Sequence, residues 1–161
     1  MPDPVICNTS PLFYLHQLDL LALLQKLYGK IVVPETVVDE LEAGRKQGED
    51  VSAVGSYAWI EIRSVRVPRL LGLSADFGPG ETEVLALALE QMGCLIIVDD
   101  WLARELARLR GLRFTGTAGV LLKAKQQGYI QMVRPLLDRL IDLGFRLSDD
   151  VRNHILALAE E

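Results

Sequence analysis

Short apolar runs alternate along the chain with longer stretches in which apolar residues recur at helical spacing. The short runs are rich in β-branched residues and end at polar residues, which is typical of buried strands. The predicted strands cover residues 4–7, 31–33, 59–65, 95–98 and 113–114. The predicted helices cover residues 11–18, 20–28, 34–44, 81–92, 100–109, 118–126, 135–143 and 148–159, with a weaker one at 51–58.

Capping residues mark the ends of several of these elements. Ser10 stands before Pro11, and this pair predicts an N-cap followed by the first helical position. Thr117 and Ser148 are predicted to cap the helices that follow them in the same way. Residues 45–50 and 68–80 are predicted loops, since the first stretch is polar and the second is irregular.

The alternation of strands and helices indicates the fold class. It predicts a three-layer α/β/α sandwich around a central, mostly parallel sheet. No internal repeat, low-complexity tract or linker interrupts the chain, so residues 1–161 are predicted to form one domain. The core is expected over about 4–128, and the helices over about 131–161 are expected to form an extension that covers one side or contacts a partner.

Composition narrows the function. The chain has 161 residues, 17 basic and 22 acidic side chains and a net charge of -5, which argues against coating nucleic acid by bulk charge. This charge balance is compatible with a nuclease whose acidic centre is neutralised by a metal ion. Cys7 and Cys94 lie in apolar surroundings and suggest buried, reduced thiols rather than a disulfide framework. The first residues lack a signal sequence and no apolar run reaches spanning length, so we expect a cytoplasmic protein without a membrane segment.

Polar and acidic residues stand where the apolar strands end. Asn8 follows the first strand, Asp99 and Asp100 follow the run at 95–98, and Glu81 and Glu83 open a long helix. In an open parallel sheet, ligands collect at the carboxyl ends of strands. Carboxylates gathered there repel one another unless they are protonated or bind a cation. Because hard divalent cations such as Mg²⁺ prefer oxygen ligands, the pattern predicts a metal site and phosphate chemistry.

Four ordered segments carry a resemblance to a known family: VICNTS at 5–10, VPETVVDE at 33–40, GETEVLALA at 80–88 and LIIVDD at 95–100. In this order and spacing, the chain resembles the PIN-domain family of Mg²⁺- or Mn²⁺-dependent ribonucleases. Many members of that family are toxins of VapC-type toxin–antitoxin pairs. The resemblance covers about residues 4–128, and it implies a nuclease that cuts single-stranded RNA, an antitoxin partner and a homodimer.

The resemblance and the strand ends together imply a set of site residues. The expected catalytic carboxylates are Glu40, Glu81, Glu83 and Asp99. The expected metal ligands are Asn8, Glu40, Glu83, Asp99 and Asp100. Substrate contacts are expected from Thr9, Ser10 and Arg104. Glu81 and Glu83 cannot be told apart, because residues two apart on a helix point to different faces. Asp100 is a candidate ligand, a group that orients a ligand, or a helix cap.

Other interpretations of these residues stay open. The acids at helix starts also complement helix dipoles, Glu40 alone would be solvated surface, and Arg104 alone would belong to a solvated helix face. Asn8 stands where the family commonly has Asp, and Asn supplies a carbonyl oxygen without negative charge. A weakened or inactive PIN-fold module that binds nucleic acid or protein is therefore the alternative function. A phosphate-receiver domain is less compatible, because no convincing pair of a phospho-accepting Asp and a later Lys is found.

Overall fold

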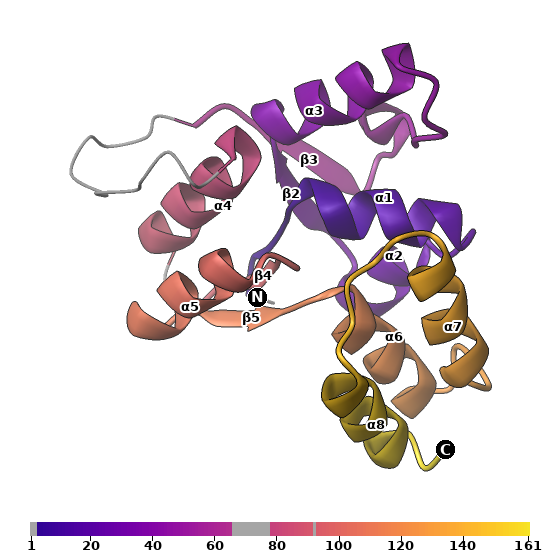
Figure 1. The fold of residues 1–161 in the computed structure, drawn as a ribbon. Helices are drawn as coiled ribbons and strands as arrows, with labels where there is room; N and C mark the ends of the chain where they lie inside the picture. Colours follow the sequence, from indigo (N-terminus) through magenta and orange to yellow (C-terminus); the bar gives the residue numbers. More distant parts are fainter. Residues whose placement is uncertain (1–2, 66–77, 92) are drawn as a thin grey trace.

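Five parallel strands form the central sheet in the order β3–β2–β1–β4–β5 (Figure 1). The computed structural model describes residues 3–65, 78–91 and 93–161. The strands are β1 (Val5–Cys7), β2 (Ile31–Pro34), β3 (Ile60–Arg63), β4 (Leu95–Ile97) and β5 (Arg113–Thr115). Every pairing between them is parallel, so the predicted α/β class is confirmed.

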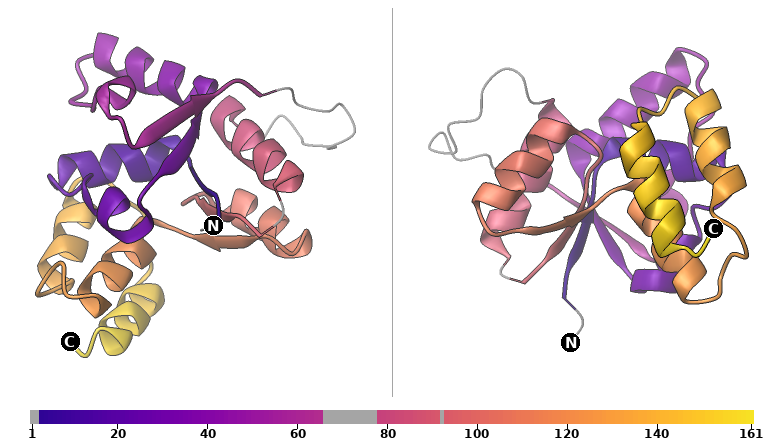
Figure 2. Two further views of the ribbon diagram at one scale, coloured as in Figure 1. Left: turned by 180° about the vertical axis from the view of Figure 1, so that it is seen from behind. Right: turned by 60° about the horizontal axis from the view of Figure 1, so that its bottom comes forward.

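Helices cover both faces of the sheet, as the continuous apolar character of β1 and β4 requires. Figure 2 shows α4 and α5 on one side of the strands and α1, α2 and α6 on the other. Helix α3 contacts both α1 and α4. The bounds are α1 (Thr9–Gln17), α2 (Leu23–Tyr28), α3 (Glu35–Lys46), α4 (Pro79–Glu90), α5 (Trp101–Leu109) and α6 (Thr117–Gln126).

The two C-terminal helices, α7 (Arg134–Asp142) and α8 (Asp149–Leu158), lie beside α6 (Figure 1). Val133, Leu137 and Leu140 are fully buried and belong to the same apolar core as the sheet. The Glu161 carboxylate also accepts hydrogen bonds from the backbone N–H of Val133 at 2.7 Å and of Arg134 at 3.0 Å. The α7–α8 hairpin, residues 134–158, is therefore packed into the fold rather than loosely appended to it.

Two predicted helix caps are wrong. Helix α1 begins at Thr9 with Asn8 as its N-cap, so Ser10 lies inside the first turn and Pro11 is not the first helical residue. Helix α6 begins at Thr117 itself, with Gly116 before it. The physical reason is the same in both cases, since each hydroxyl bonds to Asp99 on another element instead of to its own helix. The Ser148 cap is confirmed, since its Oγ accepts a hydrogen bond from the Val151 N–H.

Other element boundaries also differ from the prediction. The weak helix at 51–58 is only a 3-10 turn, Val54–Ser56. The helix predicted at 20–28 begins three residues later, after a turn. The predicted loop at 68–80 ends early, because Pro79 and Gly80 already belong to α4, and residues 68–77 lie outside the described residues. A proline suits the first turn of a helix, where its missing N–H has no partner to lose.

Candidate active site

The register of the sheet brings the predicted strand-end residues to one edge. Ile97 of β4 pairs with Cys7 of β1 and with Thr115 of β5. The ladder continues one step further, because the Asn8 N–H donates to the Ile97 carbonyl at 3.0 Å. The residues that follow these strands therefore leave the sheet side by side at its carboxyl edge.

Asp99 is held by three hydrogen bonds at this edge. Its carboxylate accepts from the Ser10 hydroxyl, the Thr117 hydroxyl and the Thr117 backbone N–H, each at 2.7 Å. Asp99 thus caps the start of α6 rather than the start of α5, the helix that follows it in sequence. An ideal Cβ at Gly116 would lie 2.7 Å from the Asp99 Oδ1, so this position needs glycine for space.

Glu40 is held at the same edge from the other side. Its carboxylate accepts from the Thr9 hydroxyl at 2.5 Å and from the Gly80 backbone N–H at 2.8 Å. The second bond places Glu40 at the N-terminus of α4, where helix backbone N–H groups favour negative charge. The Glu40 carboxylate is therefore fixed by two hydrogen bonds and is not the freely solvated side chain that its polar neighbours in sequence allowed.

Asp100 and Glu81 each cap their own helix. The Asp100 carboxylate accepts from the Ala103 N–H at 2.9 Å, and the Glu81 carboxylate accepts from the Gly78 N–H at 3.1 Å. Burial raises the pKa of Glu81, and the charges of Asp100 and Glu40 raise it further, although the Gly78 N–H lowers it. Burial is thus the main reason for the raised pKa, and the two neighbouring carboxylates add to it.

Two buried oxygens of the predicted ligand set have no partner. Asn8 is 4% exposed and, although it is the N-cap of α1, its side chain makes no capping hydrogen bond. Within the described residues, the Asn8 Oδ1 and the Glu83 Oε2 are buried and accept no hydrogen bond. Buried acceptors normally find a donor or another positive partner. The chemistry of these oxygens therefore fits a hard divalent cation.

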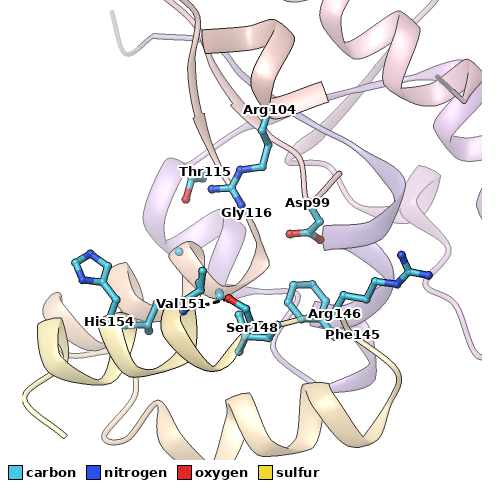
Figure 3. A pocket seen from close by; sticks show the side chains of 13 residues that line it. Asp99, Arg104, Thr115, Gly116, Phe145, Arg146, Ser148, Val151 and His154 are labelled. Carbon is cyan, nitrogen blue, oxygen red and sulfur yellow. Dashed lines mark hydrogen bonds between the residues drawn. The ribbon is translucent and has the colours of Figure 1, made fainter. Parts of the chain in front are cut away.

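Seven of the predicted site residues line two adjoining cavities, which together we call the acidic groove. One cavity, of about 280 Å³, includes Thr9 and Glu40. The other, of about 300 Å³, includes Asp99 and Asp100. Both are lined by Asn8, Ser10, Tyr14 and Glu81. Arg104 lies outside the acidic groove and lines a third cavity, which Asp99 also lines (Figure 3).

The acids line the acidic groove without forming a closed cage. Among residues 3–65, 78–91 and 93–161, no three His, Cys, Asp or Glu side chains are close enough together to hold one ion. Glu83 is buried in α4 and lines neither cavity of the acidic groove. The Glu40 and Asp99 carboxylates instead bond to hydroxyl groups and backbone N–H groups.

Sequence reasoning missed Tyr14 and Phe145 as groove residues. Burial raises the pKa of Tyr14, and the negative charge of Asp99 raises it further, so the hydroxyl keeps its proton. The Tyr14 ring packs edge to face on Phe145, with ring centroids 5.0 Å apart. Tyr14 lies on the helix that follows Asn8, but no motif marks it in the sequence. Nothing in the sequence connects the distant Phe145 to this edge.

Cys7 is excluded as a nucleophile at this edge. It is fully buried at the end of β1, directly before Asn8. Burial raises the pKa of its thiol well above the ordinary value, and the charge of Asp99 raises it further. The thiolate is the reactive form of cysteine, so Cys7 is an inert core residue, as its apolar surroundings in the sequence suggested.

A family model described as a PIN domain, DUF3368, matches residues 4–161. The chain belongs to the PIN-domain family. The match confirms the predicted family and extends through the α7–α8 hairpin. It also makes this a fold of nuclease type, in a family that generally uses divalent metal ions. A search of curated proteins found no match to the chain. None of the helices in the described residues is long and apolar enough to cross a membrane.

Proposed function

We propose that this PIN domain is a Mg²⁺- or Mn²⁺-dependent endoribonuclease that hydrolyses phosphodiester bonds of single-stranded RNA. One observation carries the proposal: among the described residues, the buried Asn8 Oδ1 has no hydrogen-bond partner in a groove that is lined by the carboxylates of Glu40, Glu81, Asp99 and Asp100. A second unpartnered oxygen, the Glu83 Oε2, is buried in α4 outside the groove. That combination is costly without positive charge, because like charges and unpaired acceptors both disfavour the folded state. A divalent cation relieves both.

The proposed ligands are Asn8, Glu40, Glu83, Asp99 and Asp100. A bound divalent cation would offset charge on the phosphate and make the attacking water more acidic. The chain's own groups orient the ligands, since the Ser10 and Thr117 hydroxyls hold Asp99 and the Thr9 hydroxyl holds Glu40.

The substrate contacts that we propose come from hydroxyl groups at this edge, which keep their protons and can donate hydrogen bonds to a phosphate. The Tyr14 hydroxyl stays protonated, so it is available to donate to a phosphate oxygen. We assign Thr9 and Ser10 to the same role when their carboxylate partners turn toward a cation. Cavities of about 300 Å³ hold single nucleotides rather than a duplex, and this supports a single-stranded substrate.

Cleavage of end-labelled single-stranded RNA by the purified protein tests the proposal. We expect cleavage with Mg²⁺ or Mn²⁺, none with EDTA, and loss of cleavage in Asp99→Asn. Asp39→Asn is the matched control, because Asp39 is an exposed acid next to Glu40 on α3 that lines neither cavity of the acidic groove. If the wild-type protein cuts neither RNA nor single-stranded DNA, and calorimetric titration shows no Mn²⁺ binding, the proposal is wrong.

Asn8 favours a second candidate, a PIN-fold module that binds nucleic acid or protein without cutting it. The site has one carboxylate fewer than the family commonly has, and Glu40 and Asp99 already have hydrogen-bond partners. The variant Asn8→Asp separates the two functions. A nuclease with a weakened site gains Mn²⁺ affinity and cleavage rate, whereas a binding module gains neither.

The toxin role, the antitoxin and the homodimer belong to the same proposal. Expression of the wild-type protein in a bacterial host is expected to arrest growth, and Asp99→Asn is expected to remove that effect. A small protein encoded next to this chain is expected to co-purify with it and to restore growth. Light scattering of the purified protein tests the dimer, and a monomeric mass at micromolar concentration contradicts it.

A further inference from the structure

A third cavity opens next to the acidic groove, and we call it the hairpin cavity. It has a volume of about 360 Å³ and lies between the β5–α6 turn and the start of α8 (Figure 3). Asp99, Phe145 and Arg146 line both the hairpin cavity and the acidic groove, so the two spaces adjoin. A strand with its cleaved bond at Asp99 would therefore extend into this cavity.

The charge of the hairpin cavity is opposite to that of the acidic groove. Arg104 and Arg146 line it, and Asp99 is the single carboxylate among its lining residues in the described parts of the chain. No described residue forms a hydrogen bond or ion pair with either guanidinium group. Arg104 is held by the face of Phe114, with its guanidinium carbon 5.1 Å from the ring centroid.

The end of the acidic groove away from Asp99 is negatively charged, and this sets the direction in which a bound strand is expected to run. Glu40 and Glu49 line that end, and none of the described residues that line it is a Lys or Arg. A phosphate backbone is repelled by carboxylates and attracted by unpaired guanidinium groups. The strand is therefore expected to leave Asp99 toward Arg104, with Arg146 at the boundary between the two cavities.

The opposite wall of the hairpin cavity is apolar and aromatic. The connection before α8 contributes Phe145 and Leu147, and α8 contributes Val151, His154 and Ile155. Phe145 is fixed by its edge-to-face contact with Tyr14. Aromatic and apolar side chains beside a positive groove form the usual platform for a base of single-stranded nucleic acid.

We propose that the hairpin cavity holds the nucleotide adjacent to the cleaved bond, with one backbone phosphate on Arg104, another on Arg146 where the two cavities adjoin, and the base against Phe145 and α8. This assignment rests on the proposed nuclease function and adds a substrate subsite to it. It gives the α7–α8 hairpin a role in selecting RNA, beyond its role in the core.

Binding of a short, 5′-labelled single-stranded RNA, measured by fluorescence anisotropy with Ca²⁺, tests the phosphate contacts. We expect the double variant Arg104→Ala/Arg146→Ala to weaken binding on the order of tenfold or more, as expected for lost charge-assisted hydrogen bonds. The slope of log affinity against log salt should also fall in magnitude by about 0.7 for each arginine removed. Arg110→Ala, at an exposed position just after α5, is the matched control and should change neither quantity.

Loss of the Arg104 side chain from the face of Phe114 could disturb the fold, so the single variant Arg146→Ala is measured as well. Arg146 is exposed, and its removal is not expected to affect folding. RNA affinity within twofold of wild type and an unchanged salt slope for Arg146→Ala overturn the proposal. These measurements do not need cleavage. If the wild-type protein binds RNA through the hairpin cavity but cuts nothing, the nuclease function fails and the subsite stands.

The base contact is tested by filling the cavity. Val151 is 47% exposed at the cavity wall, so Val151→Trp is expected to occupy the space without disturbing the core. Once the cleaved position is mapped, an RNA that lacks the adjacent base should bind wild type more weakly than intact RNA. Val151→Trp should remove that difference. If the variant keeps the full preference for the intact RNA, the base does not lie in the hairpin cavity.

Discussion

Asp99 is predicted to be both a structural cap and a metal ligand, and two substitutions separate these roles. Asp99→Asn keeps one carbonyl oxygen as an acceptor and removes the charge. Asp99→Ala removes every acceptor. Both variants are expected to lose cleavage, because each removes a carboxylate ligand, but they are expected to differ in stability.

The difference in stability follows from the three hydrogen bonds that Asp99 accepts. The alanine variant leaves the Ser10 hydroxyl and both Thr117 donors without a partner. Thr117 is 0% exposed, so water does not replace the lost acceptor at its two donors. An unsatisfied buried donor costs about 1–3 kcal/mol, so the total loss for the two Thr117 donors is about 2–6 kcal/mol. The asparagine variant keeps the bond from the Thr117 N–H, and its loss is about 1 kcal/mol.

Urea denaturation at pH 7 with EDTA measures these free energies of unfolding, and cleavage of labelled RNA with Mn²⁺ measures activity. Asp100→Asn serves as a comparison, because within the described residues the Asp100 carboxylate accepts one hydrogen bond, from the Ala103 N–H of its own helix. The reasoning is refuted if Asp99→Ala unfolds at the same urea concentration as wild type. It is also refuted if Asp99→Asn cleaves RNA at the wild-type rate.

Three further predictions concern other residues. Gly116→Ala places a Cβ 2.7 Å from the Asp99 Oδ1, so it should lower the free energy of unfolding in urea by about 1–3 kcal/mol and reduce cleavage. The control Gly55→Ala, whose Cβ would have its nearest neighbour at 3.7 Å, should change neither quantity. Glu81→Gln should raise the thermal midpoint at pH 7 without metal. The raised pKa of Glu81 means that the protonated carboxyl favours the folded state and that this stability is lost as pH rises through the pKa, whereas the neutral Gln side chain does not ionise. An unchanged or lower midpoint contradicts this. Burial opposes ionisation of Glu161, but hydrogen bonds from Val133, Arg134 and Lys125 lower its pKa to about 2. Glu161→Gln should therefore lower the midpoint above pH 4.5, and the difference should shrink as pH falls through about 2. A difference at pH 2 as large as that at pH 7 contradicts this.

The strands and their ends were predictable because burial on both faces leaves a direct mark on the sequence. The residues of β1 and Ile96 and Ile97 of β4 are almost completely buried, so only apolar side chains fit there. The chain must become polar where it leaves the sheet. That change of character located Asn8 and Asp99 without any knowledge of how the strands pair.

The partners of the acids were not predictable in the same way. Ser10 and Thr117 look like helix caps in the sequence, because Ser and Thr at helix starts usually accept a hydrogen bond from their own helix. Here both hydroxyls donate to Asp99, which lies 89 and 18 residues away from them. A capping signal records the residue type and local spacing, and it carries no information about a carboxylate that tertiary packing brings nearby.

The α7–α8 hairpin shows how the site depends on residues outside the four recognisable segments. Phe145 joins the hairpin to the acidic groove through Tyr14, while Leu137 and Leu140 join it to the core. Removing the hairpin would expose those core contacts and open the groove at Asp99. The four segments supply the acidic oxygens, but one wall of the space around them comes from the last thirty or so residues. The segments alone are therefore sufficient to recognise the family, whereas the proposed nucleotide subsite also requires the α7–α8 hairpin.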